Sequence, residues 1–162
     1  MLLESQKFEK FASWSQFSLQ DEYAKFDSNS DIWRGTTVDD MIDVSPGMLH
    51  VGTIRAAQIP VVIEVHDAEP IESLNEWDQV TEASIDVPSG SLVVFAVDYW
   101  PDAPRINVKP GTYRAKIYYG GFETITADKT KGAEHYKVSL WLGETLPPRV
   151  VKRRDKRFHV GS

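Results

Sequence analysis

The chain has 162 residues and a mass of 18.3 kDa, which is the size of a single domain. It contains no cysteine, so disulfide bonds, thiolate metal sites and cysteine nucleophiles are excluded. A net charge of −6 argues against nucleic acid as a partner, and the apolar runs are too short for a membrane span. The first residues lack the apolar core of a signal peptide, so we expect a cytoplasmic protein.

The N-terminal residues give mixed signals. Phe8 and Phe11 are three positions apart, which is typical of a short helical lead-in over residues 1–12. Alternation over residues 14–19 predicts a first strand, with Trp14 in the core. The polar residues 27–31 predict a loop.

A short helix is expected near residues 37–44. Thr36 and Thr37 precede Asp39 and Asp40, as at a helix start, where a hydroxyl caps free N–H groups and carboxylates favour the dipole. The Pro-Gly pair at residues 46–47 then ends the helix.

The rest of the chain is predicted to form short strands separated by turns. We expect strands at residues 48–55, 59–66, 80–87, 92–97, 106–108, 112–119 and 135–142, with an edge strand near 150–151. Residues 92–97 are almost all apolar, which is typical of a strand buried on both faces. Tyr113 follows a Pro-Gly turn, so we expect its hydroxyl to bond to a nearby backbone group, and we place it with Trp141 in the core.

These signals predict an all-β protein, a single antiparallel β-sandwich of about seven or eight strands with one short helix near residues 37–44. We expect residues 1–148 to form the β-sandwich domain with its N-terminal lead-in. Residues 149–162 hold six Lys or Arg against one acid, and we expect this basic C-terminal tail to be partly disordered.

The charge is unevenly distributed along the chain. Between Arg55 and Arg105 lie 49 residues with ten carboxylates and no Lys or Arg. Such a segment is either a solvated surface that keeps the protein soluble or a face that attracts a cationic partner. The sequence leaves both readings open.

Signals for catalysis or metal binding are weak. Glu64 and His66 share one face of a predicted strand, which suits either an exposed electrostatic contact or a weak metal or acid/base pair. Acids between residues 27 and 43 lack the spacing of a calcium loop. Ser89 sits in a turn between two strands rather than in a nucleophile elbow. We therefore expect no catalytic residue, no metal site, no cofactor and no enzymatic activity.

Aromatic residues next to acids are the best candidates for partner binding. Trp77, Tyr99 and Trp100 fall in predicted loops or at strand ends, where they either anchor a partner or fold back on the core. The candidate partner-binding residues are Glu69, Glu72, Glu76, Trp77, Asp78, Asp98, Tyr99, Trp100 and Asp102.

Three segments resemble an uncharacterised family of small bacterial all-β proteins: residues 14–23, 106–121 and 135–141. The early Gln-Phe-Ser-Leu strand, the region of Trp33 and the strand order are also similar to competence protein J, an acidic inhibitor of a DNA-entry nuclease. This resemblance implies an inhibitor or immunity-like role and assigns no functional residue.

Together these observations predict a non-enzymatic acidic binding protein, an inhibitor or immunity-type partner of a cationic protein such as a nuclease or toxin. The alternative is a carbohydrate-binding β-sandwich that uses the loop aromatics. The sequence does not determine the oligomeric state.

Overall fold

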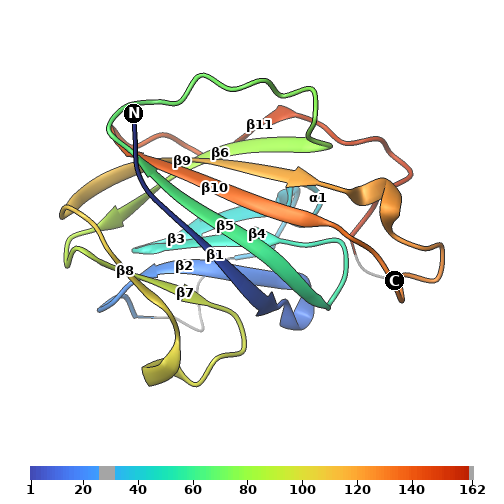
Figure 1. The fold of residues 1–162 in the computed structure, drawn as a ribbon, viewed down its shortest axis with the longest axis horizontal. Coiled ribbons are helices and arrows are strands. Elements are labelled where there is room, and N and C mark those ends of the chain that lie inside the picture. Colours follow the sequence, from blue (N-terminus) through green and yellow to red (C-terminus); the bar gives the residue numbers. More distant parts are fainter. Residues whose placement is uncertain (26–31, 161–162) are drawn as a thin grey trace.

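The computed structural model describes residues 1–25 and 32–160, which form two β-sheets packed face to face (Figure 1). The six-stranded sheet has the order β1 (Leu2–Phe11), β5 (Gln58–His66), β10 (His135–Leu142), β9 (Gly111–Gly120), β6 (Gln79–Val87) and β11 (Arg149–Lys152). The five-stranded sheet has the order β3 (Ile42–Ser45), β4 (Met48–Gly52), β2 (Gln16–Asp21), β7 (Ser91–Phe95) and β8 (Arg105–Asn107). The helical pieces are α1 (Thr37–Asp40) and three 3-10 turns, η1 (Ser13–Ser15), η2 (Trp100–Asp102) and η3 (Phe122–Thr124).

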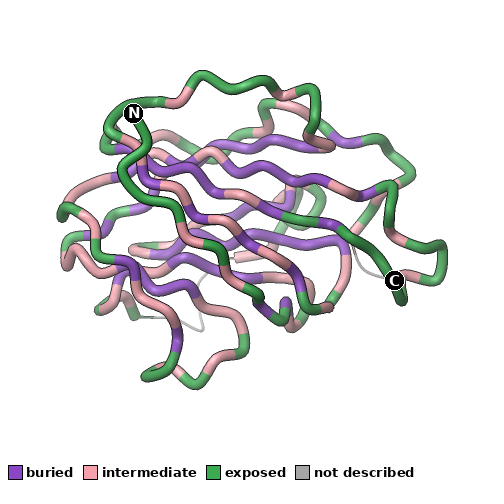
Figure 2. The backbone as a smooth tube through the Cα atoms, in the orientation of Figure 1, coloured by how far each residue is buried: buried purple, intermediate pink, exposed green. Residues whose placement is uncertain are grey.

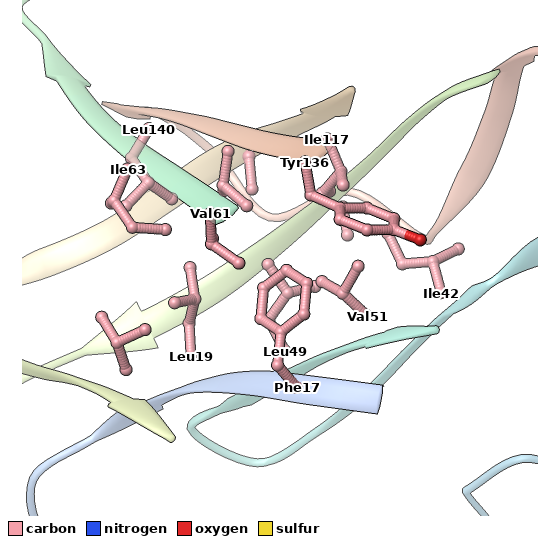
Figure 3. Close-up of a cluster of buried hydrophobic side chains, with 14 of the residues drawn as sticks. Phe17, Leu19, Ile42, Leu49, Val51, Val61, Ile63, Ile117, Tyr136 and Leu140 are labelled. Carbon is pink, nitrogen blue, oxygen red and sulfur yellow. The ribbon is translucent and has the colours of Figure 1, made fainter. Parts of the chain in front are cut away.

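The core lies between the two sheets because each strand turns every second side chain inward. Phe17 and Leu19 of β2 face Val61 and Ile63 of β5 across the sandwich, with Tyr136 between the layers (Figure 3). In Figure 2 the buried residues follow the inner strands of both sheets, while β1 and much of the connecting loops are exposed. Trp141 and Tyr113 are buried, as predicted.

The all-β class is confirmed, but the predicted count of seven or eight strands is wrong. The described residues contain eleven strands in two sheets. The sheets are also not purely antiparallel, because β10 runs parallel to β5. The sequence pattern does not reveal this parallel pair, because β5 and β10 are far apart in the chain and alternation within a strand does not say which strand is its neighbour.

Residues 1–12 are a strand and not a helical lead-in. β1 pairs with β5 in antiparallel register from Leu2 to Phe11, with a bulge between Leu2 and Glu4. Edge strands are exposed on much of both faces, so the apolar alternation that identifies inner strands is weak here.

The helix is shorter than predicted, because α1 ends at Asp40 rather than near residue 44. Met41 takes up a left-handed conformation with φ 61° and closes the helix through its backbone N–H. The next four residues form β3, which pairs with β4 across the Pro-Gly turn. A buried hairpin thus replaces the second half of the expected helix.

Two further segments, the Pro-Gly turn before β9 and the basic C-terminal tail, are held by specific contacts. The Tyr113 hydroxyl donates to the backbone carbonyl of Lys109 at 2.6 Å, which is the bond expected after the Pro-Gly turn. In the basic tail, residues 149–152 form β11 and Arg154 is buried, where it donates to Gln79 and to the backbone of Asp39. The predicted loop at residues 27–31 lies outside the described residues.

Candidate functional site

The predicted partner-binding residues fall into two groups on different sheets. Residues 69–78 belong to the connection from β5 to β6, which crosses the outer face of the six-stranded sheet over β10 and β9. Residues 98–102 belong to the connection from β7 to β8 at the end of the five-stranded sheet. In Figure 1 these two loops lie at the top and the bottom of the view. The tertiary structure does not bring them together.

The acids of the first group meet cations from distant strands. Glu72 pairs with Lys137 of β10, while Glu69 lies 4.0 Å from Arg114 and 3.9 Å from Lys116 of β9. Asp78 accepts a hydrogen bond from the backbone N–H of Phe122 at 2.9 Å. Glu76 is exposed and makes no ion pair among the described residues. Two of these four acids are therefore paired with cations of the same chain, whereas Glu76 stays exposed.

Trp77 packs against the sheet instead of projecting from it. Its ring lies 5.2 Å from the ring of Tyr118 and 5.4 Å from that of His135, and the Lys137 ammonium lies over it. A Cβ atom at Gly120 would come within 2.9 Å of this ring, so glycine lets Trp77 sit directly on β9. Trp77 acts here as a cover for the outer face of the sheet.

In the second group, one acid and one aromatic are held in place. The two carboxylate oxygens of Asp98 each accept from Lys10 Nζ at 2.6 Å, and Asp98 also accepts from the Ala96 N–H. Burial works to raise the pKa of Asp98, but these hydrogen bonds outweigh it and leave the pKa below its usual value. Trp100 packs on Phe95 and under the Arg105 guanidinium.

Tyr99 and Asp102 of the second group remain free to contact a partner. The Tyr99 side chain is 73% exposed, and Asp102 is exposed without an ion pair among the described residues. Arg105 fixes the η2 turn that carries them, by donating to the backbone carbonyls of Trp100 and Ala103. This loop therefore presents an aromatic ring and a carboxylate from a firm backbone.

The most unusual feature of the surface is Trp14, which sequence reasoning placed in the core. That prediction is wrong, because Trp14 is 87% exposed. Trp14 and Ser15 have φ values of 58° and 56°, so two successive residues other than glycine are left-handed. Such backbone costs about 1–3 kcal/mol per residue, and it persists only where the surroundings impose it.

The surroundings of this turn do impose it. Ala12 is fully buried and bonds to the Ala57 carbonyl, which anchors the end of β1. The Ser15 N–H donates back to the Ala12 carbonyl, and the Ser15 carbonyl accepts from Thr53 at 2.8 Å. The sandwich thus holds a strained backbone that turns a large apolar ring into solvent.

Trp14 stands between two surface hollows. One, of about 460 Å³, is lined by Trp14, Gln16, Phe95, Val97 and Asp98 among others, so it joins the turn to the β7–β8 loop. The other, of about 350 Å³, is lined by Trp14, Trp33 and Val38 among others. Val97 and Asp98 line the first hollow together with Trp14, and Tyr99 and Asp102 follow them on the same β7–β8 loop; we call these five residues the Trp14 corner.

The hollows rest on a hydrogen-bonded network across the outer face of the five-stranded sheet. Trp33 donates from its indole N–H to Gln16 and from its backbone N–H to Asp43, both at 2.6 Å. His50 Nε2 lies 2.9 Å from the Ser45 hydroxyl. Burial lowers the pKa of the His50 imidazole, although the nearby Asp43 carboxylate works in the opposite direction.

This Ser-His pair resembles part of a hydrolytic triad, but its third member is engaged elsewhere. The Asp43 carboxylate accepts from the backbone N–H groups of Trp33 and Val44. A triad carboxylate would instead accept from the imidazole and orient it. The network is better suited to holding Trp33 and the sheet surface in place.

The other candidates from the sequence have structural partners. Glu64 and His66 do share a face, with a 3.0 Å contact, and Glu64 also accepts from Ser139. Asp39 and Asp40 pair with Arg153.

Within residues 1–25 and 32–160, no group of three His, Asp or Glu side chains is placed to hold a metal ion. The same residues contain no helix long and apolar enough to cross a membrane.

Comparison with solved structures finds the same fold in two proteins. ComJ from Bacillus subtilis, an inhibitor of the DNA degrading activity of NucA, matches with a TM-score of 0.63 at 11% sequence identity, over 88% of this chain and 98% of ComJ. The protein described as crocagin biosynthetic gene J matches with a TM-score of 0.59 at 18% identity, over 87% of this chain and 98% of its own. No family model and no curated protein sequence matches. The resemblance to competence protein J is therefore confirmed as a likeness of fold.

Proposed function

We propose that this chain is a non-enzymatic binding protein that inhibits, or confers immunity against, a cationic protein such as a nuclease or toxin. The observation that carries this proposal is Trp14, an 87% exposed ring on a strained turn. Tryptophan is among the residues that most often dominate the energy of protein interfaces. A rigid turn also presents its ring without the entropy cost of ordering a loop on binding.

The contact is assigned to the Trp14 corner rather than to the whole acidic segment. Glu69 and Glu72 already pair with cations of the chain, so they have less charge to offer a partner. Asp102, by contrast, is exposed beside Tyr99, and Val97 is 62% exposed. Apolar anchors with a carboxylate at the rim suit a partner surface that combines a hydrophobic pocket with Lys or Arg.

The net charge and the fold both support a basic protein, such as a nuclease, as the partner. The net charge of −6 attracts a basic protein and speeds its association. A nuclease must attract phosphates, so its active-site cleft is basic and accepts an acidic inhibitor. The likeness to ComJ supports an inhibitor role coarsely, because at 11% identity it concerns the fold alone.

The test compares the wild-type protein with Trp14→Ala and with Ile71→Ala, a matched control. Ile71 is a fully exposed apolar side chain on the β5–β6 connection, away from the corner. Each immobilised protein is incubated with host-cell lysate, and captured proteins are identified by mass spectrometry. Binding constants and DNA-degrading or toxic activities are then measured with purified partners.

We expect a basic partner whose activity the wild type inhibits. Trp14→Ala should weaken its binding by about 30-fold, the loss of a typical hot spot of 2 kcal/mol, while Ile71→Ala should not. Equal binding by all three proteins, or an acidic partner, would contradict the proposal. Binding to a glycan array that is lost in Trp14→Ala would favour the carbohydrate alternative instead.

A further inference from the structure

The strand β1 forms an open edge of the six-stranded sheet. It pairs with β5 on one side, and no described strand pairs with its other side. Figure 2 shows most of β1 exposed, in contrast to the buried strands beside it. An edge of this length carries a row of backbone N–H and C=O groups that suit another strand.

The side chains of β1 alternate between the two faces of the sheet. Gln6, Phe8 and Lys10 lie opposite buried residues of β5 and point toward the core side. Ser5, Lys7, Glu9 and Phe11 are exposed on the outer side. Lys7 and Glu9 make no ion pair with any described residue.

These residues are arranged symmetrically about Phe8. In an antiparallel pair of two β1 strands centred on Phe8, each residue faces the residue equally far on the other side of the centre. Lys7 of each copy then lies opposite Glu9 of the other, which gives two cross-strand ion pairs on the outer face. Phe8 of one copy lies opposite Phe8 of the other on the core side, so two apolar side chains face each other.

We propose that β1 is a homodimer interface, in which two copies join their six-stranded sheets edge to edge through residues 5–11. A centre on a single residue keeps the core sides of both copies on the same face of the continuous sheet, because directly opposed residues share a face. The bulge between Leu2 and Glu4 lies outside this window, so the paired stretch is regular. The contact is isologous and closed, which yields a dimer rather than a fibre.

This inference is independent of the proposed function. A single pair of strands is a small interface, so we expect a reversible dimer whose population rises with concentration. The dimer would carry two Trp14 turns, one at each end of the paired strands, because η1 follows β1 directly.

The experiment is sedimentation equilibrium of the full chain over a range of concentrations, with charge-swap variants. The wild type should approach twice the mass of the 18.3 kDa chain. Lys7→Glu and Glu9→Lys each set like charges opposite one another twice, so each should weaken dimerisation by about tenfold. The double variant Lys7→Glu/Glu9→Lys restores both pairs with exchanged signs and should dimerise like the wild type.

Glu4→Lys is the matched control, since it changes the same charge on the same strand outside the paired window. It should leave the dimer unchanged, and circular dichroism should show every variant folded. A wild type that stays monomeric, or a dimer that the single swaps leave intact, would overturn the proposal. Failure of the double variant to recover would also overturn it, because the pairing would then not be centred on Phe8.

Discussion

Trp77 and Trp14 are both tryptophans near turns, yet they have opposite relations to the fold. Trp77 packs against β9, in contact with Tyr118 and with the Lys137 ammonium over its ring, whereas Trp14 stands in solvent on a strained turn. Glu69 and Glu72, on the loop that carries Trp77, pair with cations of β9 and β10, while Glu76 on the same loop and Asp102 of the Trp14 corner are both exposed without an ion pair among the described residues. The contacts of Trp77 stabilise the fold, whereas the exposed ring and strained turn of Trp14 suit the partner contact that we propose. Residue type and charge alone do not distinguish these two roles.

The largest difference should come from removing each ring in turn. Trp77→Ala exposes the aromatic surface of Tyr118 and removes the contact with Lys137. We therefore expect a loss of about 2–3 kcal/mol in the free energy of unfolding. Trp14→Ala removes a ring with little buried area and should change that free energy by less than about 0.5 kcal/mol. Urea denaturation of both variants measures the contrast. Similar losses for the two variants would mean that Trp14 also supports the fold.

Acid should lower the free energy of unfolding through His50, which lies on β4 of the five-stranded sheet. Burial lowers the pKa of His50 in the folded protein, whereas the unfolded chain takes up this proton near pH 6.5. The unfolded state therefore binds more protons below about pH 6.5, and the free energy of unfolding falls with the pH, by at most about 1.4 kcal/mol per unit.

The variant His50→Gln isolates this contribution, since glutamine keeps a polar group and does not titrate. Denaturation curves at pH 7, 6 and 5 should show a smaller loss of stability for His50→Gln than for the wild type. Parallel pH profiles would show that the titration of His50 does not contribute.

The smallest effect is a gain in stability. Trp14→Gly places glycine at φ 58°, where it has no steric cost, so we expect the free energy of unfolding to rise by up to about 1 kcal/mol. Partner binding should fall in the same variant as in Trp14→Ala. Thermal denaturation together with a binding measurement tests whether stability and binding oppose each other here. A loss of stability would indicate that the ring holds its own turn in place.

The inner strands could be predicted closely from the sequence. The expected strands at residues 59–66, 80–87, 112–119 and 135–142 agree with β5, β6, β9 and β10 to within one residue at either end. These strands lie inside the six-stranded sheet, and apolar residues recur at every second position on their core side. β1 was missed because it is an edge strand, and Trp14 because its alternation with Phe17 and Leu19 gives no sign of a left-handed turn.

The sequence by itself determined the all-β class, the inner strands and the overall negative charge, because these depend on local alternation and on composition. Only the tertiary structure decided which acids remain free. Arg114, Lys116 and Lys137 are far from residues 69–72 in the chain, and strand pairing brings them together. The tertiary structure also decided that Trp14 is exposed, since the bond from Ala12 to the Ala57 carbonyl and the bond from the Thr53 N–H to the Ser15 carbonyl fix the turn. Contacts between distant residues set both outcomes, and no local pattern in the sequence records them.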